Sequence, residues 1–89
     1  MAVEPLRGVI VPMLTPFADD ASIAVDLYVR HAEWLIEQGA AGIAPFGTTG
    51  EALSIGIDER IAALEGLVDA GIDPQRMIPG TGMSNVADT

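Results

Sequence analysis

The feature that most constrains the fold is a repeat in which short apolar runs alternate with segments of helical periodicity. In chain order, these segments span residues 6–14, 25–38, 41–46, 57–70 and 76–80. The first, third and fifth are predicted to be strands, and the second and fourth are predicted to be helices. Gly39 and Gly71 stand where a left-handed residue would end each helix, and they are 32 residues apart. Because this interval matches one βα unit, the predicted order is β-α-β-α-β.

Each predicted helix carries apolar residues on one face. In the first helix these are Val25, Tyr28, Val29, Ala32, Leu35 and Ile36. In the second helix they are Ile57, Ile61, Leu64, Leu67 and Val68. We expect Gly56 to cap the second helix and the Glu59 carboxylate to reach back to it.

Helices that connect buried strands favour a parallel sheet, and therefore an α/β fold. Three parallel strands leave the backbone groups of both outer strands unpaired. A (β/α)8 barrel takes about 250 residues, far more than this chain has. We therefore interpret residues 1–89 as the N-terminal part of a single (β/α)8 TIM barrel domain, comprising its first three strands and two helices.

The charge and the missing residue types exclude several functions. The chain has thirteen acidic residues and four arginines, so its formal net charge is −9. We therefore expect neither nucleic acid nor an anionic membrane as a partner. The chain has no cysteine, which excludes disulfides and thiolate metal sites, and we expect neither a metal nor a cofactor. It also has no lysine, so these residues supply neither a Schiff-base lysine nor the lysine of a P-loop.

Hydropathy predicts a folded protein without a membrane anchor. The chain is 49% hydrophobic and 19% charged, unlike disordered sequences. Its longest apolar runs fall well short of the roughly 18 residues of a membrane span. The first residues do not combine a basic stretch with an apolar one, so we expect no secretory signal and a cytoplasmic location.

Two turns rich in glycine and threonine follow the second and third predicted strands. They read Gly47-Thr48-Thr49-Gly50-Glu51 and Gly80-Thr81-Gly82. In parallel α/β folds, ligands lie at the carboxyl ends of the strands. Glycines let backbone N–H groups approach a ligand, and threonine hydroxyls add donors, so these turns suit a carboxylate or phosphate oxygen. From the residues alone, they are equally consistent with tight connections between strand and helix.

The second turn does not complete a dinucleotide-binding motif. That motif requires a glycine where Asn85 stands, and the glycines around Gly47 have the wrong spacing for it.

Several motifs in series carry a resemblance to one enzyme family. They are Gly47-Thr48-Thr49-Gly50-Glu51 after a short strand, Glu59-Arg60 in the next helix, Pro79-Gly80-Thr81-Gly82, Thr15-Pro16-Phe17 and Trp34-Leu35-Ile36. Over essentially the whole chain, the sequence resembles the N-terminal third of the dihydrodipicolinate synthase / N-acetylneuraminate lyase family. This resemblance implies a (β/α)8 barrel, usually a homotetramer, that performs class I aldolase chemistry on pyruvate or a related 2-oxo acid, with an aldehyde as a further partner.

The resemblance also implies roles for particular residues. In the family, a lysine from a later strand forms the Schiff base and a tyrosine from the middle of the barrel shuttles protons. The paired threonines hold the substrate carboxylate, which assigns substrate binding to Thr48 and Thr49 and a catalytic place in the proton relay to Thr48. Gly47 and Gly50 would shape the turn around them. Residues 1–89 would then supply the carboxylate clamp without the nucleophile, and we expect them to be inactive alone.

The chain departs from the family pattern in two ways, and two other functions remain open. Its single tyrosine, Tyr28, lies in the first predicted helix, and Gly56 replaces a serine that is frequent in the family. One alternative is a non-catalytic half-barrel that acts as a binding or assembly module and completes itself by oligomerisation. The other is a phosphate-binding βαβ unit. Within the family, synthase, lyase and hydratase-aldolase activities all remain open, as does the second substrate.

Overall fold

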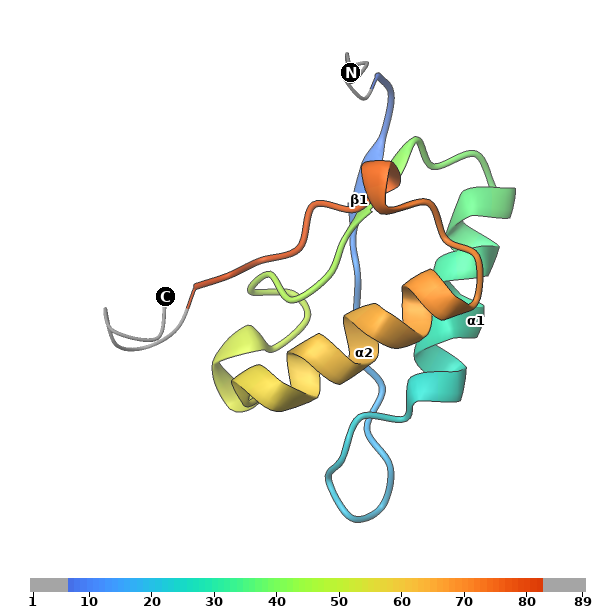
Figure 1. The fold of residues 1–89 in the computed structure, drawn as a ribbon. Coiled ribbons are helices and arrows are strands. Elements are labelled where there is room, and N and C mark those ends of the chain that lie inside the picture. The colour runs from blue at the N-terminus through green and yellow to red at the C-terminus, as the bar shows by residue number, and fades with distance from the viewer. Residues whose placement is uncertain (1–6, 83–89) are drawn as a thin grey trace.

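The alternation of strands and helices predicted from the sequence is present through the second helix in the computed structural model, which describes residues 7–82. The elements in chain order are β1 (Ile10–Pro12), α1 (Val25–Glu37), β2 (Gly42–Ala44), the 3-10 helix η1 (Ala52–Ser54), α2 (Ile57–Asp69) and the 3-10 helix η2 (Pro74–Arg76) (Figure 1). Strands β1 and β2 pair in parallel, with Ile10 opposite Gly42. The connection through α1 is therefore a crossover of the kind that the sequence predicts.

The two helices begin where the sequence predicts, and each ends one residue earlier. Gly39 and Gly71 adopt φ values of +103° and +99°, which confirms the left-handed residue expected after each helix. The backbone N–H of Gly56 donates to the Glu59 carboxylate at 3.3 Å, so the expected link at the start of α2 is present.

The third predicted strand, residues 76–80, is only partly formed. Arg76 belongs to η2, and a single parallel bridge joins Met77 to Ile43. The N–H of Ile78 donates to the Ile43 carbonyl at 2.9 Å, and the N–H of Gly80 donates to the Pro45 carbonyl at 2.8 Å. Residues 77–80, called here the third segment, therefore follow β2 in parallel. Pro79 has no N–H to donate, which limits a regular ladder here.

The first predicted strand is also shorter than expected. It begins at Ile10 rather than near residue 6, which lies outside the described residues, and it ends at Pro12. One further bond, from the N–H of Met13 to the Ala44 carbonyl at 3.1 Å, continues the pairing past Pro12. Pro12 at the end of the strand agrees with the preference of proline for strand ends and edges.

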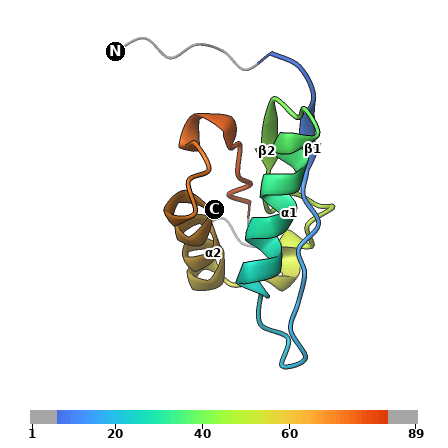
Figure 2. The ribbon, with the colours of Figure 1, turned by 90° about the vertical axis from the view of Figure 1, so that its right-hand side faces the viewer.

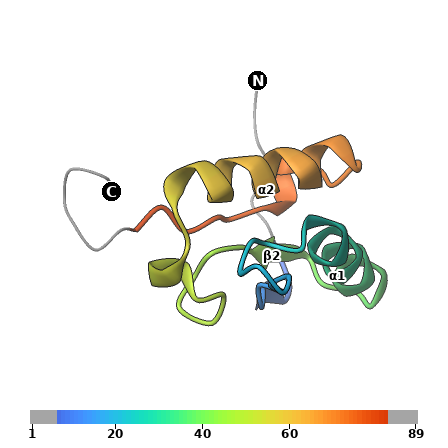
Figure 3. The same ribbon diagram turned by 90° about the horizontal axis from the view of Figure 1, so that it is seen from below.

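The core lies between the sheet and α1, and α1 also packs against α2 (Figure 2). Figure 3 shows both helices placed around β2. Fully buried side chains include Met13, Tyr28, Ile43 and Leu67. A Cβ atom on Gly66 would lie 2.9 Å from Val25 Cγ1, so glycine lets the two helices approach each other closely.

The buried face of α2 differs in part from the prediction. Its buried residues are Arg60, Ala63 and Leu67, while Ile61 and Val68 are 49% and 44% exposed. The apolar periodicity gave the helix correctly and its inward face in part: of the predicted residues, Leu67 is fully buried and Leu64 packs against the core. Within residues 7–82, neither helix has the length and apolarity that a bilayer crossing requires.

Candidate functional site

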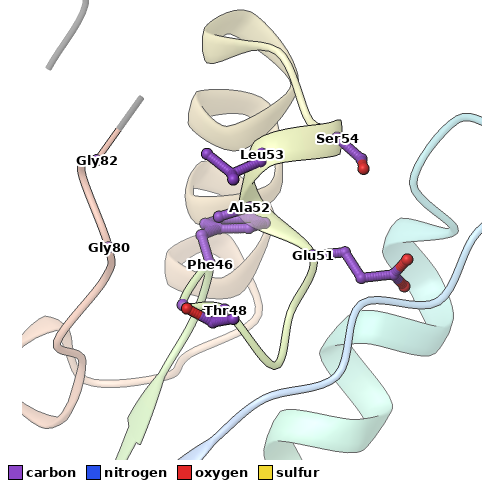
Figure 4. Close-up of a pocket in the computed structure, with 9 residues that line it drawn as sticks. Phe46, Thr48, Glu51, Ala52, Leu53, Ser54, Gly80 and Gly82 are labelled. Carbon is purple, nitrogen blue, oxygen red and sulfur yellow. The ribbon is translucent and has the colours of Figure 1, made fainter. Parts of the chain in front are cut away.

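The two turns singled out in the sequence lie on opposite sides of one open pocket. The pocket has a volume of about 480 Å³ and lies where β2 and the third segment end. It is lined by Phe46, Gly47, Thr48, Glu51, Ala52, Leu53, Ser54, Gly80 and Gly82 (Figure 4). The fold therefore brings together two turns that are about 30 residues apart in the sequence, at the carboxyl end of a parallel sheet, where ligands of α/β proteins bind.

The four candidate residues take different positions around this pocket. Gly47 and Thr48 line it. Both threonines are exposed, but Thr49 does not belong to the lining. Gly50 is buried behind the turn. A Cβ atom on Gly47 would meet nothing within 4 Å, so this glycine leaves space at the pocket wall.

Hydrogen bonds inside the turn close it on itself. The N–H groups of Gly50 and Ala52 donate to the Gly47 carbonyl at 3.1 and 3.3 Å, and the N–H of Glu51 donates to the Thr48 carbonyl at 3.0 Å. Among the described residues, the N–H groups of Thr48 and Thr49 take no part in these turn bonds. The main-chain bonds of the turn therefore leave both of these N–H groups unused.

Two residues in the left-handed region flank the turn. Phe46 has a φ of +60° and Glu51 has a φ of +58°. This conformation is unfavourable for residues with a side chain and persists where surrounding contacts hold it. The buried ring of Phe46 stacks on Tyr28 with the ring centres 5.6 Å apart and the planes 10° apart. Packing thus holds the start of the turn in place.

Thr15 fixes the end of the turn, a role that the sequence did not reveal. Its buried hydroxyl donates to the Gly50 carbonyl at 2.7 Å. A Cβ atom on Gly50 would lie 2.7 Å from the Met13 carbonyl oxygen and 3.1 Å from Thr15 Oγ1. Only glycine fits this close approach between the turn and the chain that leaves β1. The single signal in the sequence was the place of Thr15 in the Thr15-Pro16-Phe17 motif.

The glycines of the second turn have separate roles. A Cβ atom on Gly80 would lie 2.2 Å from the Phe46 carbonyl oxygen, so glycine permits the third segment to cross the end of β2. A Cβ atom on Gly82 would meet nothing within 4 Å. Gly80 therefore sets how closely the two walls approach at their base, while Gly82 stands where the pocket is open.

The lining of the pocket carries a single charged side chain, and its charge is negative. This residue is Glu51, and its carboxylate extends away from the two glycines toward α1 (Figure 4). The buried guanidinium of Arg60 stands behind the walls, where it donates to the carbonyls of Ala52 and Gly82. The sequence offered Arg60 only as part of the Glu59-Arg60 motif, without a role.

Tyr28 is not part of this pocket. Its ring is fully buried, and burial raises the pKa of the phenol above its ordinary value, so the group remains neutral at physiological pH. The Thr15 side chain lies close enough to its hydroxyl to offset part of this rise in pKa, but within residues 7–82 the hydroxyl makes no hydrogen bond of normal geometry. In the same part of the chain, no three acidic or histidine side chains converge as metal ligands would.

Comparisons with known proteins agree with the family resemblance that the motifs indicate. The sequence model described as the dihydrodipicolinate synthetase family matches residues 5–89. The 4-hydroxy-tetrahydrodipicolinate synthase of Rhizobium meliloti is 35% identical over 82 residues, which are 92% of this chain and 28% of the relative.

Two solved structures show the same arrangement of elements. The N-acetylneuraminate lyase of Proteus mirabilis superposes with a TM-score of 0.84 and 35% identity, over 96% of this chain and 29% of that chain. A variant of the 2-keto-3-deoxygluconate aldolase of Sulfolobus solfataricus in complex with pyruvate superposes with a TM-score of 0.67 and 33% identity, over 71% of this chain and 22% of that chain. This chain thus spans less than a third of the length of these relatives.

Proposed function

Since this chain belongs to the dihydrodipicolinate synthetase family, as its motifs predicted, we propose that it forms the N-terminal part of a pyruvate-dependent Schiff-base lyase built on a (β/α)8 barrel. In this proposal, residues 1–89 supply the pocket that receives the carboxylate of a 2-oxo acid. A lysine from outside these residues supplies the nucleophile, because the chain has none. The parent enzyme forms or cleaves a carbon–carbon bond next to the keto group, with an aldehyde as the further partner.

The observation that carries this proposal is the pocket between the turn after β2 and the third segment. It has Thr48 in its wall and a backbone turn whose Thr48 and Thr49 N–H groups are not used internally. A carboxylate has about four lone-pair directions to satisfy, and neutral donors aimed at it form charge-assisted bonds. A solved relative with the same arrangement of elements is a complex with pyruvate, which supports this choice of ligand.

The neutral character of these donors matters for the chemistry. A positively charged clamp would hold the carboxylate but would also repel a protonated amine nearby. Donors without formal charge leave the lysine amine free to attack the keto carbon and form the imine, with the keto oxygen leaving as water. The protonated imine then withdraws electrons from the neighbouring carbon. In this proposal, the Thr48 hydroxyl also passes a proton to or from the reacting group, while Thr49 contributes through the backbone of the turn.

The test is borohydride trapping with pyruvate in the protein in which residues 1–89 continue into the rest of the barrel. We expect a stable adduct on a lysine there and no adduct on the 89-residue chain, whose only amine is its N-terminus. Thr48→Val should weaken trapping at low pyruvate far more than Thr49→Val, because only the first side chain lines the pocket. An adduct on the isolated chain, or equal effects of the two variants, would contradict the proposal.

A second candidate function is a non-catalytic assembly module, and exposed apolar side chains favour it. Val9, Leu14, Leu53 and Ile78 are each at least half exposed, and such side chains typically mark surfaces that another element covers. Size-exclusion chromatography of the 89-residue chain separates the two candidates. A sharp soluble oligomer supports the module, whereas aggregation supports the barrel segment. The homotetramer remains a prediction of the family resemblance, and the cytoplasmic location remains a prediction from the first residues of the sequence.

A further inference from the structure

We propose that Arg60 is a positioning residue that holds the two walls of the pocket at a fixed separation. Its Nη1 donates to the Gly82 carbonyl at 2.8 Å, and its Nη2 donates to the Ala52 carbonyl. Ala52 belongs to the wall that follows β2, and Gly82 belongs to the wall that follows the third segment (Figure 4). One side chain from α2 therefore joins both walls from behind. This inference rests on the proposed function of the pocket as a carboxylate site.

The position of Arg60 is unfavourable for stability by itself. Its side chain is 5% exposed, and it lies in the first turns of α2, where the helix dipole repels a cation. Its partners are main-chain carbonyls rather than a carboxylate, and its Nε atom is buried with no partner among residues 7–82. An apolar side chain of similar size often fills such a site at lower cost. The arrangement therefore indicates that Arg60 serves to position the two walls of the pocket rather than to stabilise the fold.

The shape of the guanidinium suits this role. Its planar fork presents donors in fixed directions, so it can bond two acceptors on different segments at once, whereas a lysine ammonium is a single compact donor. Along the third segment, the bond from Gly80 N–H to Pro45 is the last main-chain link to β2 within the described residues. Beyond that link, the hydrogen bonds of Arg60 connect Gly82 to the wall that contains Ala52.

The chain offers a matched control in Arg76. Its Nε donates to the Ala41 carbonyl at 3.0 Å, and its Nη2 donates to the Ala40 carbonyl at 2.7 Å. Arg76 thus also joins separate parts of the chain through two main-chain acceptors. It does so at the start of β2, the end opposite the pocket. Replacing Arg76 should lower the free energy of unfolding about as much as replacing Arg60 does, but it should not weaken ligand binding.

The experiment compares Arg60→Met, Arg60→Lys and Arg76→Met in the protein that carries residues 1–89 as its N-terminal part. We expect Arg60→Met to raise the KM for pyruvate by about tenfold or more, with a smaller change in kcat, because misplaced walls weaken binding in the ground state and the transition state alike. Arg60→Lys should recover part of this loss, and Arg76→Met should leave KM unchanged. Hydrogen exchange should accelerate in residues 47–52 and 80–82 of Arg60→Met alone.

Every other outcome of this experiment also supports or overturns the positioning role of Arg60. A folded Arg60→Met protein with KM within about twofold of the unmodified protein overturns the inference, as does an equal rise in Arg76→Met. If Arg60→Met does not fold, Arg60→Lys carries the same comparison. If the unmodified protein neither turns over nor traps pyruvate, the proposed function fails. Hydrogen exchange then still tests Arg60, because unchanged exchange at both walls would refute its positioning role without any substrate.

Discussion

Replacing Gly80 with alanine tests the close crossing that brings the two walls of the pocket together. A Cβ atom there would lie 2.2 Å from the carbonyl oxygen of Phe46 and 2.9 Å from its carbonyl carbon. Both atoms belong to the backbone, so no side-chain rotation relieves the contact. The backbone at Gly80 is not in the left-handed region, and the substitution therefore changes the contact without adding strain in φ.

The expected cost follows from these distances. Carbon and oxygen atoms of neighbouring strands approach to about 3.3 Å, so the third segment must move away by about 1 Å. That movement breaks the bond from the Gly80 N–H to the Pro45 carbonyl, now 2.8 Å long. Overpacking costs about 1–3 kcal/mol, and a lost backbone bond costs about 1 kcal/mol. We therefore expect the free energy of unfolding to fall by about 2–4 kcal/mol.

Urea-induced unfolding of the protein that carries residues 1–89 as its N-terminal part, followed by circular dichroism, measures this loss. Gly82→Ala is the matched control, because a Cβ atom at that position would meet nothing within 4 Å. We expect Gly82→Ala to unfold at nearly the same urea concentration as the unmodified protein, and Gly80→Ala to unfold at a clearly lower one. Equal midpoints for the two variants would show that the third segment does not press against the end of β2, and the reasoning would be refuted.

Two further substitutions probe the surroundings of the turn after β2, and a third probes the loop before α1. Thr15→Val keeps the side-chain volume but leaves the Gly50 carbonyl without its buried donor, so unfolding experiments should show a loss of about 1–3 kcal/mol, and Thr15→Ser should recover most of it. Tyr28→Phe removes a buried hydroxyl without a partner in the described residues and should therefore leave stability unchanged or raise it by up to about 1 kcal/mol in the same assay. The Ser22 side chain and N–H donate to Asp20 and hold the pKa of that carboxyl below its ordinary value of 3.8. A lowered pKa favours the folded turn above the unfolded-state pKa, and this contribution is lost as the pH falls through the lower, folded-state pKa. An NMR titration of Ser22→Ala should show the Asp20 pKa moving back up, and an unchanged pKa would contradict the assignment.

Local signals were sufficient for most of the helical structure. The glycines at 39 and 71 end their helices because the left-handed conformation after a helix depends on residues within one turn. The first helix buries the predicted face, including Tyr28, Ala32 and Leu35. The third strand was predicted less well, because apolar residues favour a strand wherever they occur, while Pro79 limits the hydrogen bonds that a ladder needs.

By itself, the sequence determined the family, the order of the elements through α2 and the turn that follows β2, because motifs and periodicity depend on residues that are close together in the sequence. Only the tertiary structure decided which residues meet around the pocket. It brings Thr15 against Gly50 and Arg60 between Ala52 and Gly82, and it leaves Thr49 outside the lining. The physical reason is that contacts between residues 22 and 35 positions apart depend on how the strands and helices pack, which no local pattern specifies.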